Sequence, residues 1–557
     1  MTMSTATTPR VLVITGGLLT EKDTSLRQVF HKQRLQTRYA SGDWLETKIK
    51  LLAAEPLITE RLEQRLHRGR ARLAPDLRQR MFNGADTVTT PDLTEVVLIT
   101  ALAHAGLDCL TLTVADLFAD PVRSARRLRE CDCVFLSTTF LRDQSELMPI
   151  LDRLQPAGKH LVLGGPLVSQ IQAHWPGHAA VAVLAVGYGE YLVPRLADWI
   201  HSGFRQLDAP PRGRIERRAA TTIVFSGTPE GRSLDGLPRP EWERVQPRGS
   251  LHHVYYESVR GCPYRCGFCN YPYLFDDTRF RYRSAEKMAD DWEYFVRNLG
   301  VTSITCLDSL FTIPRRRLQR FCRLLIDRNI RVRWLCYARA DDLCDEDTLA
   351  LMKAAGLYQV QIGIESGHQQ QLDNMNKQCS IEANALALHN CRRHGVTSIV
   401  SLIVGYPGET AASLEATYRF LRDAPPDFYY LAAFSTRAEG VPILSAESRH
   451  RFALEVSGDT HTTAPYWRHG SMDCREAANN IRQLNHRLMA ERISLNAVLF
   501  YRGLGNYRAG DRSALLDYQQ RVATRHTLTR GIFSLLHRVV DRRLASDMHN
   551  RLLCHHA

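Results

Sequence analysis

The 557-residue sequence lacks an apolar run long enough to cross a bilayer. Its most apolar stretch, residues 179–193, is interrupted by Gly187, Gly189 and Glu190. The first residues are rich in Thr and Ser and lead directly into an apolar segment at 11–15, without the apolar core or cleavage site of a secretory signal. We therefore expect a cytoplasmic protein with no membrane span.

A disulfide framework is not expected either. The chain contains fourteen cysteines, but a long sequence without a secretory signal keeps its thiols reduced or uses them as metal ligands. One dense basic tract is also missing, because the net charge of +13 is spread along the sequence. Such a charge permits contact with a nucleic acid, an acidic peptide or a phosphorylated substrate without favouring any of them.

Two stretches of alternating apolar and amphipathic segments organise the chain, which is too long for a single hydrophobic core. In the first stretch, residues 1–204, we predict strands at 10–15, 108–114, 133–138, 160–164 and 180–186, with helices at 90–105, 122–130, 145–154 and 191–203. This α/β pattern predicts a Rossmann-like parallel sheet that binds its ligand at the carboxyl ends of the strands. Residues 20–89 do not follow the alternation and are expected to form a helical insertion.

The second stretch predicts a partial barrel. Clusters of Pro and Gly mark residues 205–250 as a linker with room for a small hairpin. Six βα units follow within residues 251–440, with strands predicted at 253–259, 303–307, 331–337, 359–364, 398–404 and 428–434. They fit a (β/α)₆ barrel with active residues at the carboxyl ends of its strands. Residues 441–557 are expected to form a mainly helical C-terminal domain, with a helix at 474–496, that caps the barrel and selects the substrate.

Three thiols, Cys262, Cys266 and Cys269, lie within eight residues directly after the first predicted barrel strand. Thiolates are the ligands of iron–sulfur clusters, and a short loop that contains Gly and Pro can wrap around a cubane. A structural zinc site would need four ligands, and no second cysteine pair follows. Three ligands leave one iron open to the amino and carboxylate groups of S-adenosylmethionine (SAM). We therefore predict that these cysteines hold a [4Fe-4S] cluster that binds SAM.

This loop and the βα units after it resemble the radical SAM superfamily, and the chain up to about residue 435 resembles the subgroup with an N-terminal cobalamin-binding domain. The resemblance implies that Phe268 lies against the adenine of SAM and that Asp308 and Arg339 line the SAM or substrate pocket. It also implies that Glu365 binds the ribose or the methionyl amino group and that the backbone around Gly405 contacts the adenine edge. A single Glu or Arg at a strand end is equally well explained as an ion pair that stabilises the fold.

Small residues follow three predicted strands of the N-terminal domain: Ser137 and Thr138, then Gly164 and Gly165, then Gly187, Gly189 and Glu190. Glycines let the backbone approach a flat, bulky ligand, although a tight strand-to-helix turn explains them as well. Directly before a radical SAM core, these loops resemble the cobalamin-binding domain of the subgroup. The Asp-x-His-x-x-Gly motif that supplies a histidine to cobalt is absent after Thr15, and His174 follows the wrong strand. We therefore expect cobalamin without a histidine ligand.

After the barrel, Trp467, His469 and Met472 resemble a W-x-H-x-x-M element of these enzymes. Two interpretations are open at this point. The element either packs the last domain onto the barrel or contacts the substrate.

The resemblance implies a cobalamin-dependent radical SAM methyltransferase. One SAM would remethylate cobalamin, and a second SAM on the open iron would give a 5'-deoxyadenosyl radical that removes hydrogen from an unactivated carbon, which then takes the methyl group. The implied substrate is a small molecule or peptide of natural-product biosynthesis, and the implied reductant is a flavodoxin or ferredoxin. No residue is assigned a catalytic role beyond cofactor binding.

Three alternatives stay open. Related enzymes with both cofactors catalyse cyclisation or rearrangement without methyl transfer, and a further variant resembles the tryptophan C-methyltransferase, which moves the methyl group without an adenosyl radical. The basic charge also permits an RNA-modifying or nucleic-acid-binding protein. Radical SAM enzymes that modify transfer RNA carry a further N-terminal cysteine cluster, which Cys109, Cys131 and Cys133 do not reproduce. We therefore do not expect a nucleic acid as partner.

Overall fold

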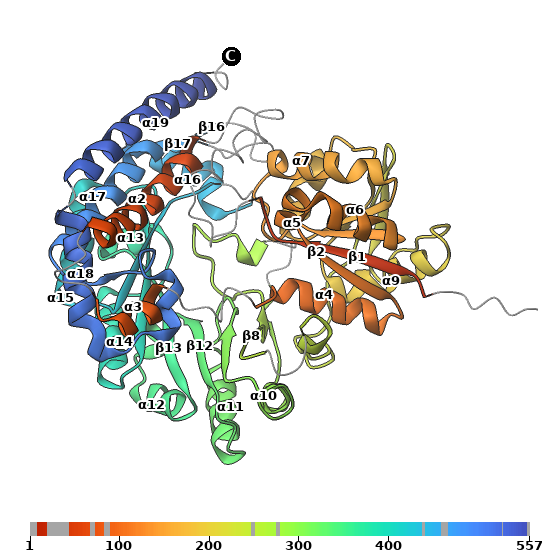
Figure 1. The fold of residues 1–557 in the computed structure, drawn as a ribbon, viewed down its shortest axis with the longest axis horizontal. Helices are drawn as coiled ribbons and strands as arrows, with labels where there is room; N and C mark the ends of the chain where they lie inside the picture. Colours follow the sequence, from red (N-terminus) through yellow and green to blue (C-terminus); the bar gives the residue numbers. More distant parts are fainter. Residues whose placement is uncertain are drawn as a thin grey trace, which may run out of the picture.

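The computed structural model describes residues 8–18, 44–66, 73–82, 90–246, 251–273, 279–436, 440–457, 466–525 and 527–553. In these ranges the chain has an α/β fold, with two mainly parallel sheets and a largely helical C-terminal region (Figure 1). Parts of the predicted insertion, at 20–43, 67–72 and 83–89, lie outside the described residues. Of the helices described, none is both long and apolar enough to cross a membrane.

The N-terminal sheet has the strand order β2-β1-β3-β4-β5-β7-β6. Its first five strands are parallel, in the doubly wound order of flavodoxin-like folds, and are β1 (Arg10–Thr15), β2 (Asp108–Thr113), β3 (Cys133–Ser137), β4 (His160–Gly164) and β5 (Val181–Val186). Helices α4 (Leu93–His104) and α9 (Gly189–His201) cover one face, and α5 (Val114–Ala119), α6 (Pro121–Glu130), α7 (Gln144–Leu154) and α8 (Pro166–Ile171) cover the other. Covering on both faces explains why β1, β3 and β5 are apolar at nearly every position.

Part of the predicted linker belongs to this sheet. Residues 214–225 form the hairpin β6 (Arg214–Arg218) and β7 (Thr221–Phe225), in which β7 pairs in parallel with β5 and antiparallel with β6. Ile223 and Val224 are fully buried. A strand this apolar gains more by joining the sheet than by crossing solvent as a linker.

The second sheet forms a partial barrel of six parallel strands with a seventh short strand at its edge, in the order β8-β11-β12-β13-β14-β15-β19. The strands are β8 (His253–Tyr256), β11 (Ser303–Cys306), β12 (Arg333–Ala338), β13 (Leu357–Glu365), β14 (Thr397–Val404) and β15 (Phe428–Ala433), with helices α10 (Ala285–Leu299), α11 (Arg315–Asp327), α12 (Glu346–Ala354), α13 (Gln369–Asn374), α14 (Ile381–Arg393) and α15 (Ala411–Asp423) between them. Trp292, Phe321 and Trp334 are fully buried and in ring contact, so aromatic packing fixes the first helices on the sheet.

The helix predicted at 474–496 ends earlier than expected. Helix α17 covers Cys474–Ala490, and β19 (Leu495–Asn496) pairs with β15 at the edge of the barrel sheet. Arg492 between them adopts a left-handed conformation with φ of 59°, which terminates the helix. The C-terminal region also contains α16 (Ala446–Phe452), α18 (Arg512–Thr524), α19 (Thr527–Leu553) and the small sheet of β16 (Glu455–Ser457), β17 (Tyr466–His469) and β18 (Met472–Asp473).

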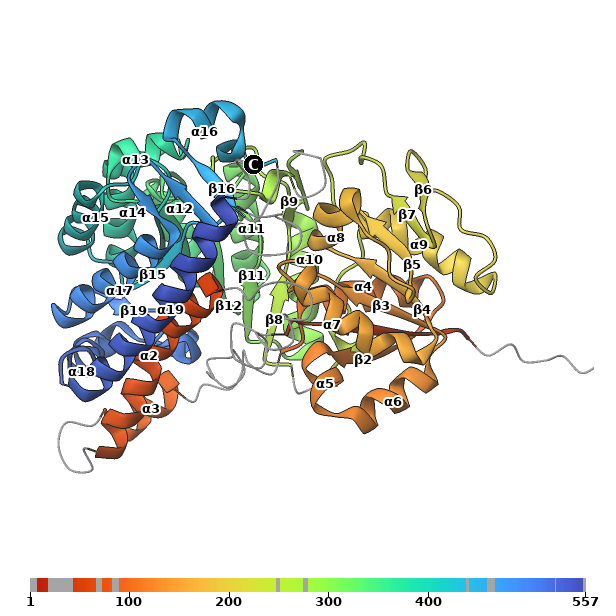
Figure 2. The same cartoon turned by 90° about the horizontal axis from the view of Figure 1, so that it is seen from above.

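The described part of the 20–89 insertion is helical, but it packs against the C-terminal domain. Helix α2 (Trp44–Leu66) lies beside α19 in both views, and α3 (Pro75–Phe82) follows it (Figures 1 and 2). Fully buried Lys48 of α2 forms an ion pair with Asp541 of α19 at 2.8 Å, and Glu55 pairs with Arg482 of α17 at 2.8 Å. The described helices of the insertion and those of the C-terminal domain therefore form one helical layer on the barrel.

Candidate functional site

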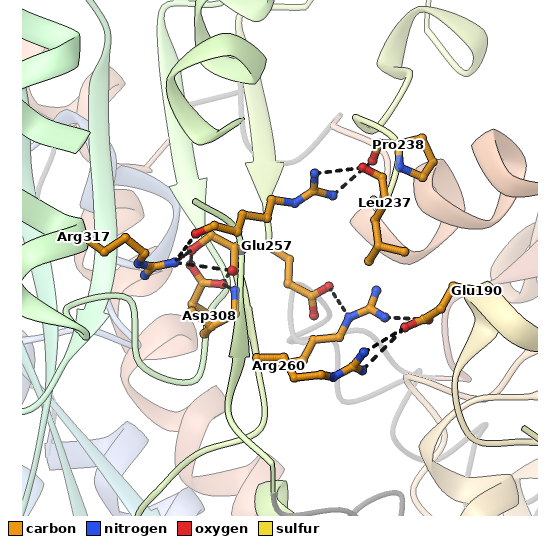
Figure 3. Close-up of polar contacts among 11 residues, drawn as sticks. Glu190, Leu237, Pro238, Glu257, Arg260, Asp308 and Arg317 are labelled. Atoms are coloured by element: carbon orange, nitrogen blue, oxygen red, sulfur yellow. Dashed lines mark hydrogen bonds and ion pairs between the residues drawn. The ribbon is translucent and has the colours of Figure 1, made fainter. Parts of the chain in front are cut away.

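The carboxyl edge of the N-terminal sheet faces the barrel. Figure 1 shows β1 running from the outer side of the N-terminal domain toward the barrel strands. Glu190, in the first turn of α9, forms ion pairs with Arg260 at 2.7 Å and with Arg281 at 3.4 Å. Figure 3 shows Arg260 between Glu190 and Glu257. Arg260 lies two residues before Cys262, so this cluster joins the N-terminal domain directly to the start of the cysteine loop.

The cysteine loop is fixed by the barrel around it. Gly267 donates its N–H to the carbonyl of Met375 at 2.7 Å, and its own carbonyl accepts from the N–H of Ile443 at 3.1 Å. A Cβ atom on Gly267 would lie 2.4 Å from the hydroxyl of Tyr406, so only glycine fits there. The side chain of Asn376 donates to the carbonyl of Arg265 at 2.9 Å. The conformation of the loop thus depends on residues more than a hundred positions further along the chain.

The three thiols fit an iron–sulfur cluster by donor chemistry. Cys266 is buried and the other two thiols are half-buried. Burial raises the pKa of each thiol, to about 11 for Cys269, while Lys377 and Arg339 act in the opposite direction on Cys262 and Cys266. Bound iron deprotonates a coordinating thiol, and the two cations offset the resulting negative charge. In the described ranges no three His, Cys, Asp or Glu converge as a single metal ion requires; in a [4Fe-4S] cluster the thiolates bind separate irons.

Arg339 and Glu365 are joined to this loop and to its neighbour Lys377. The guanidinium of Arg339 lies 3.9 Å from the ring centroid of Tyr264, between the first two cysteines, and donates to the carbonyl of Gln378 at 2.8 Å. Glu365, with φ of 64°, forms a buried ion pair with Lys377 at 2.9 Å. Backbone strain of this kind persists where surrounding contacts enforce it, often at functional sites.

Phe268 is linked to the same group of residues. Its ring makes an edge-to-face contact with Tyr406, and the ammonium of Lys377 lies 5.8 Å from its centroid. Lys377 was not predicted, because a lone lysine in a loop matches no motif. Its position only becomes informative once Glu365 and the cysteine loop are brought beside it.

The polar atoms of Asp308, which is predicted to line the SAM or substrate pocket, are engaged by protein groups. Its carboxylate is buried and accepts hydrogen bonds from the N–H of Val259 at 2.7 Å and from the hydroxyl of Ser258 at 2.8 Å. Arg317 reaches the same hydroxyl from the other side (Figure 3). With its polar atoms engaged in this way, Asp308 supports the chain that leads into the cysteine loop.

Gly405 also has partners within the protein, and the contact of its backbone with adenine stays a prediction. Its N–H donates to Glu409 at 2.5 Å, and its carbonyl accepts from His469 at 3.2 Å. A Cβ atom on Gly405 would lie 2.6 Å from the ring of Trp467, which is fully buried. Of the two interpretations of the W-x-H-x-x-M element, the structure therefore shows packing of the C-terminal domain onto the barrel.

Glu409 provides a prediction about pH. Burial raises its pKa to about 8 from the ordinary value of 4.5. Between these two pH values the folded state therefore keeps a proton on Glu409 that the unfolded state has released. Stability is therefore expected to fall as pH rises from 5 to 8, by at most about 1.4 kcal/mol per pH unit. Glu409→Gln keeps an acceptor for the N–H of Gly405 and should flatten this dependence in denaturant titrations, whereas Glu447→Gln on exposed α16 should not. Equal slopes in wild type and Glu409→Gln would contradict the prediction.

The loops at the carboxyl edge of the N-terminal sheet pack closely on one another. The hydroxyl of Thr138 donates to the carbonyl of Gly164 at 2.9 Å, and the hydroxyls of Ser137 and Thr139 are hydrogen-bonded to each other at 3.0 Å. A Cβ atom on Gly165 would lie 3.0 Å from Thr138 Oγ1, whereas one on Gly189 would meet no atom within 4 Å. The loops after β3 and β4 thus approach each other so closely that little space is left for a side chain at Gly165, whereas open space remains at Gly189.

Gly187 and Glu190 have structural partners as well. Gly187 has φ of 108°, and a Cβ atom there would lie 2.2 Å from the hydroxyl of Ser226, which also accepts the N–H of Tyr188 at 3.0 Å. Glu190, predicted to contact the cofactor, forms ion pairs with Arg260 and Arg281. The side chain of Glu190 therefore serves the contact between the N-terminal domain and the barrel.

His174 lies at the opposite edge of the sheet. Arg218, beside the amino end of β7, donates to the carbonyls of Gln172 and Ala173 at 2.5 and 2.6 Å. The expectation of cobalamin without a histidine ligand stays a prediction.

Replacing Glu190 tests the link between the domains. Glu190→Gln removes the carboxylate that neutralises Arg281, whose side chain is only 3% exposed, and should lower the free energy of unfolding by about 3 kcal/mol. Hydrogen exchange of residues 259–262 should also become faster. Glu257→Gln is the matched control, because Glu257 pairs with Arg260 within the barrel domain. A larger effect of the control than of Glu190→Gln would contradict this role.

Residues 256–421, which include the cysteine loop and most of the barrel, match the Radical SAM superfamily. The chain therefore contains a radical SAM domain, a class of domain that holds a [4Fe-4S] cluster and SAM. Over about two thirds of its length the chain is similar in fold to the radical SAM methyltransferase TsrM from Kitasatospora setae, whose structure contains cobalamin and a [4Fe-4S] cluster. The TM-score is 0.52 at 19% identity, over 65% of this chain and 77% of that one, and such a similarity shows a shared fold.

Two relatives differ in activity. The chain is 36% identical over 285 residues to the anaerobic magnesium-protoporphyrin IX monomethyl ester cyclase of Rubrivivax gelatinosus. The matched region is 46% of this chain and 51% of the relative. It is 27% identical over 279 residues to the uncharacterised methyltransferase PH0819 of Pyrococcus horikoshii, covering 48% and 59%. The chain thus spans about half the length of these relatives.

Proposed function

We propose that this protein is a cobalamin-dependent radical SAM methyltransferase that transfers a methyl group to a carbon of a small molecule or peptide in natural-product biosynthesis. The observation that carries the proposal is the joining of the carboxyl edge of the N-terminal sheet to the cysteine loop through Glu190, Arg260 and Arg281. Ligands of parallel α/β sheets bind at this edge. The arrangement supports two cofactors that face one substrate.

In this proposal the protein positions both cofactors and excludes water. Cys262, Cys266 and Cys269 hold the cluster, and Ser137, Gly164 and Gly189 approach cobalamin. When bound, the cluster supplies the electron that cleaves SAM, and cobalamin carries the methyl group. Arg339 holds Tyr264 within the loop, and Lys377 fixes the carboxylate of Glu365 beside Phe268. A flavodoxin or ferredoxin serves as reductant.

Anaerobic purification with cobalamin supplied tests the proposal. The expected result is a corrin absorption spectrum together with about four irons per chain. Reduction in the presence of SAM should then release 5'-deoxyadenosine, and its absence from a preparation that still methylates would favour the mechanism without an adenosyl radical. A protein that binds no corrin under these conditions would overturn the cobalamin-dependent function.

Cyclisation is a second candidate, favoured by the 36% identity to the Rubrivivax cyclase over 285 residues. Magnesium-protoporphyrin IX monomethyl ester is the direct probe, because methyl transfer adds one methylene to the mass of a substrate and cyclisation does not. A product with a new ring and no label from methyl-labelled SAM would establish the second candidate over the first.

A further inference from the structure

A cavity of about 590 Å³ lies at the amino edge of the N-terminal sheet, between the starts of β4 and β5, the end of α9 and the β6–β7 hairpin. Its volume is in the range of small-molecule sites. Ala180, Ala182 and Ala220 line it, and their short side chains leave the space open. The first half of β5, Val181 to Val183, also lines it, so the last three residues of the strand separate it from the cofactor loops by about 10 Å. Figure 2 shows the hairpin and α9 on the side of the domain away from the barrel.

One wall of the cavity is aromatic. The ring centroid of Phe204 lies 4.1 Å from that of His160 and 5.0 Å from that of Trp199. Phe204 is held over these rings in a left-handed conformation with φ of 63°, by an N–H bond to the carbonyl of Trp199 at 2.9 Å. Burial lowers the pKa of His160, so its ring is uncharged at neutral pH and offers a flat surface for stacking. The wall fits a planar ring.

The charged side chains of the lining are all cationic, and Gln155 and Thr222 add uncharged polar groups. Lys159, Arg205 and Arg217 line the cavity, and no Asp or Glu does so. Among the residues that the structure describes, none of these three cations forms an ion pair with a carboxylate. On the other side of the same hairpin, Arg214 is neutralised by Glu216 at 2.8 Å. The unpaired charges therefore belong to the cavity and not to the hairpin as a whole.

We propose that this cavity binds a nucleoside monophosphate. The base would stack on His160 and Phe204, and the phosphate would lie between Lys159 and Arg217, whose ammonium and guanidinium groups form charge-assisted hydrogen bonds with phosphate oxygens. A neutral planar ring would contact only the aromatic wall, and a free anion would contact only the cations. The site does not depend on the proposed methyl transfer, and it includes neither the carboxyl edge of the N-terminal sheet nor the cysteine loop.

Calorimetric titration of the reconstituted full-length protein, saturated with SAM and cobalamin, tests the proposal with AMP, adenosine and inorganic phosphate as probes. Saturation with SAM prevents AMP from reporting on the adenine site of the barrel. AMP should bind with one-to-one stoichiometry, and adenosine and phosphate should each bind at least tenfold more weakly. Heat from AMP that does not saturate, or equal affinity for AMP and phosphate, would overturn the proposal.

Variants localise the binding. Lys159→Ala and Arg217→Ala should each weaken AMP binding about tenfold, and Ala220→Trp should abolish it by filling the cavity from an exposed turn position. Arg214→Ala is the matched control and should bind AMP like wild type, since Arg214 does not line the cavity. Unchanged affinity in both Lys159→Ala and Arg217→Ala, with every variant folded by circular dichroism, would assign the binding to another site and refute the inference.

Discussion

Cys266→Ala is expected to abolish cluster binding. It removes the buried member of the three thiols and leaves two ligands for a cluster that the sequence supplies with three. Iron content should fall from about four per chain to background, and the electron paramagnetic resonance signal of the reduced protein should disappear. Release of 5'-deoxyadenosine from SAM should fall below detection, because the electron donor to SAM is lost with the cluster.

The matched control is Cys344→Ala. This thiol is half-buried in the barrel and lies against the backbone carbonyls of Ala340 and Ala383 at 3.4 Å. Its replacement should leave iron content and the spectrum unchanged. The prediction fails if Cys266→Ala keeps its full iron content, or if Cys344→Ala loses as much iron while both variants retain the wild-type circular dichroism spectrum.

The elements of both sheets were largely predictable from sequence, because the signals are local. Apolar runs at 10–15 and 160–164 coincide with β1 and β4, and the cysteine loop directly follows the strand predicted at its start. Periodicity could not assign β7 to the N-terminal sheet, because Pro and Gly on both sides of it are typical of a linker. Nor could it place α2, whose ion-pair partners Arg482 and Asp541 lie near the other end of the chain.

The candidate site was predictable as a set of strand ends but not in its pairings. Asp308 and Glu190 both lie at the expected edges. The carboxylate of Asp308 accepts a hydrogen bond from Ser258, and that of Glu190 pairs with Arg260. The sequence connects neither carboxylate to its partner. Lys377 gave no signal at all. A carboxylate at a strand end has the same sequence signature whether it meets a ligand or an arginine from another element, so the distinction requires tertiary contacts.

Gly261→Ala is expected to displace the cysteine loop. Gly261 has φ of 80°, and a Cβ atom there would lie 2.0 Å from the carbonyl oxygen of Arg279, so the chain must move. It cannot move freely, because β9 (Val259–Arg260) pairs with β10 (Arg281–Tyr282) just before it. The displacement therefore falls on Cys262, the next residue, and most of the cluster should be lost on reconstitution, as measured by iron content.

Gly300→Ala separates this collision from the cost of the backbone conformation alone. Gly300 ends α10 with φ of 74°, close to that of Gly261, but a Cβ atom on it would meet no atom within 4 Å. Both substitutions pay roughly 1 kcal/mol for placing alanine in a left-handed conformation. Only Gly261→Ala adds a steric conflict with backbone, which cannot be relieved by rotating a side chain.

Gly300→Ala should therefore lower the unfolding free energy by roughly 1 kcal/mol and keep its full iron content. If the two variants lost iron equally, the geometry of the loop entrance would not control cluster binding, and the placement of Cys262 by β9 and β10 would be refuted.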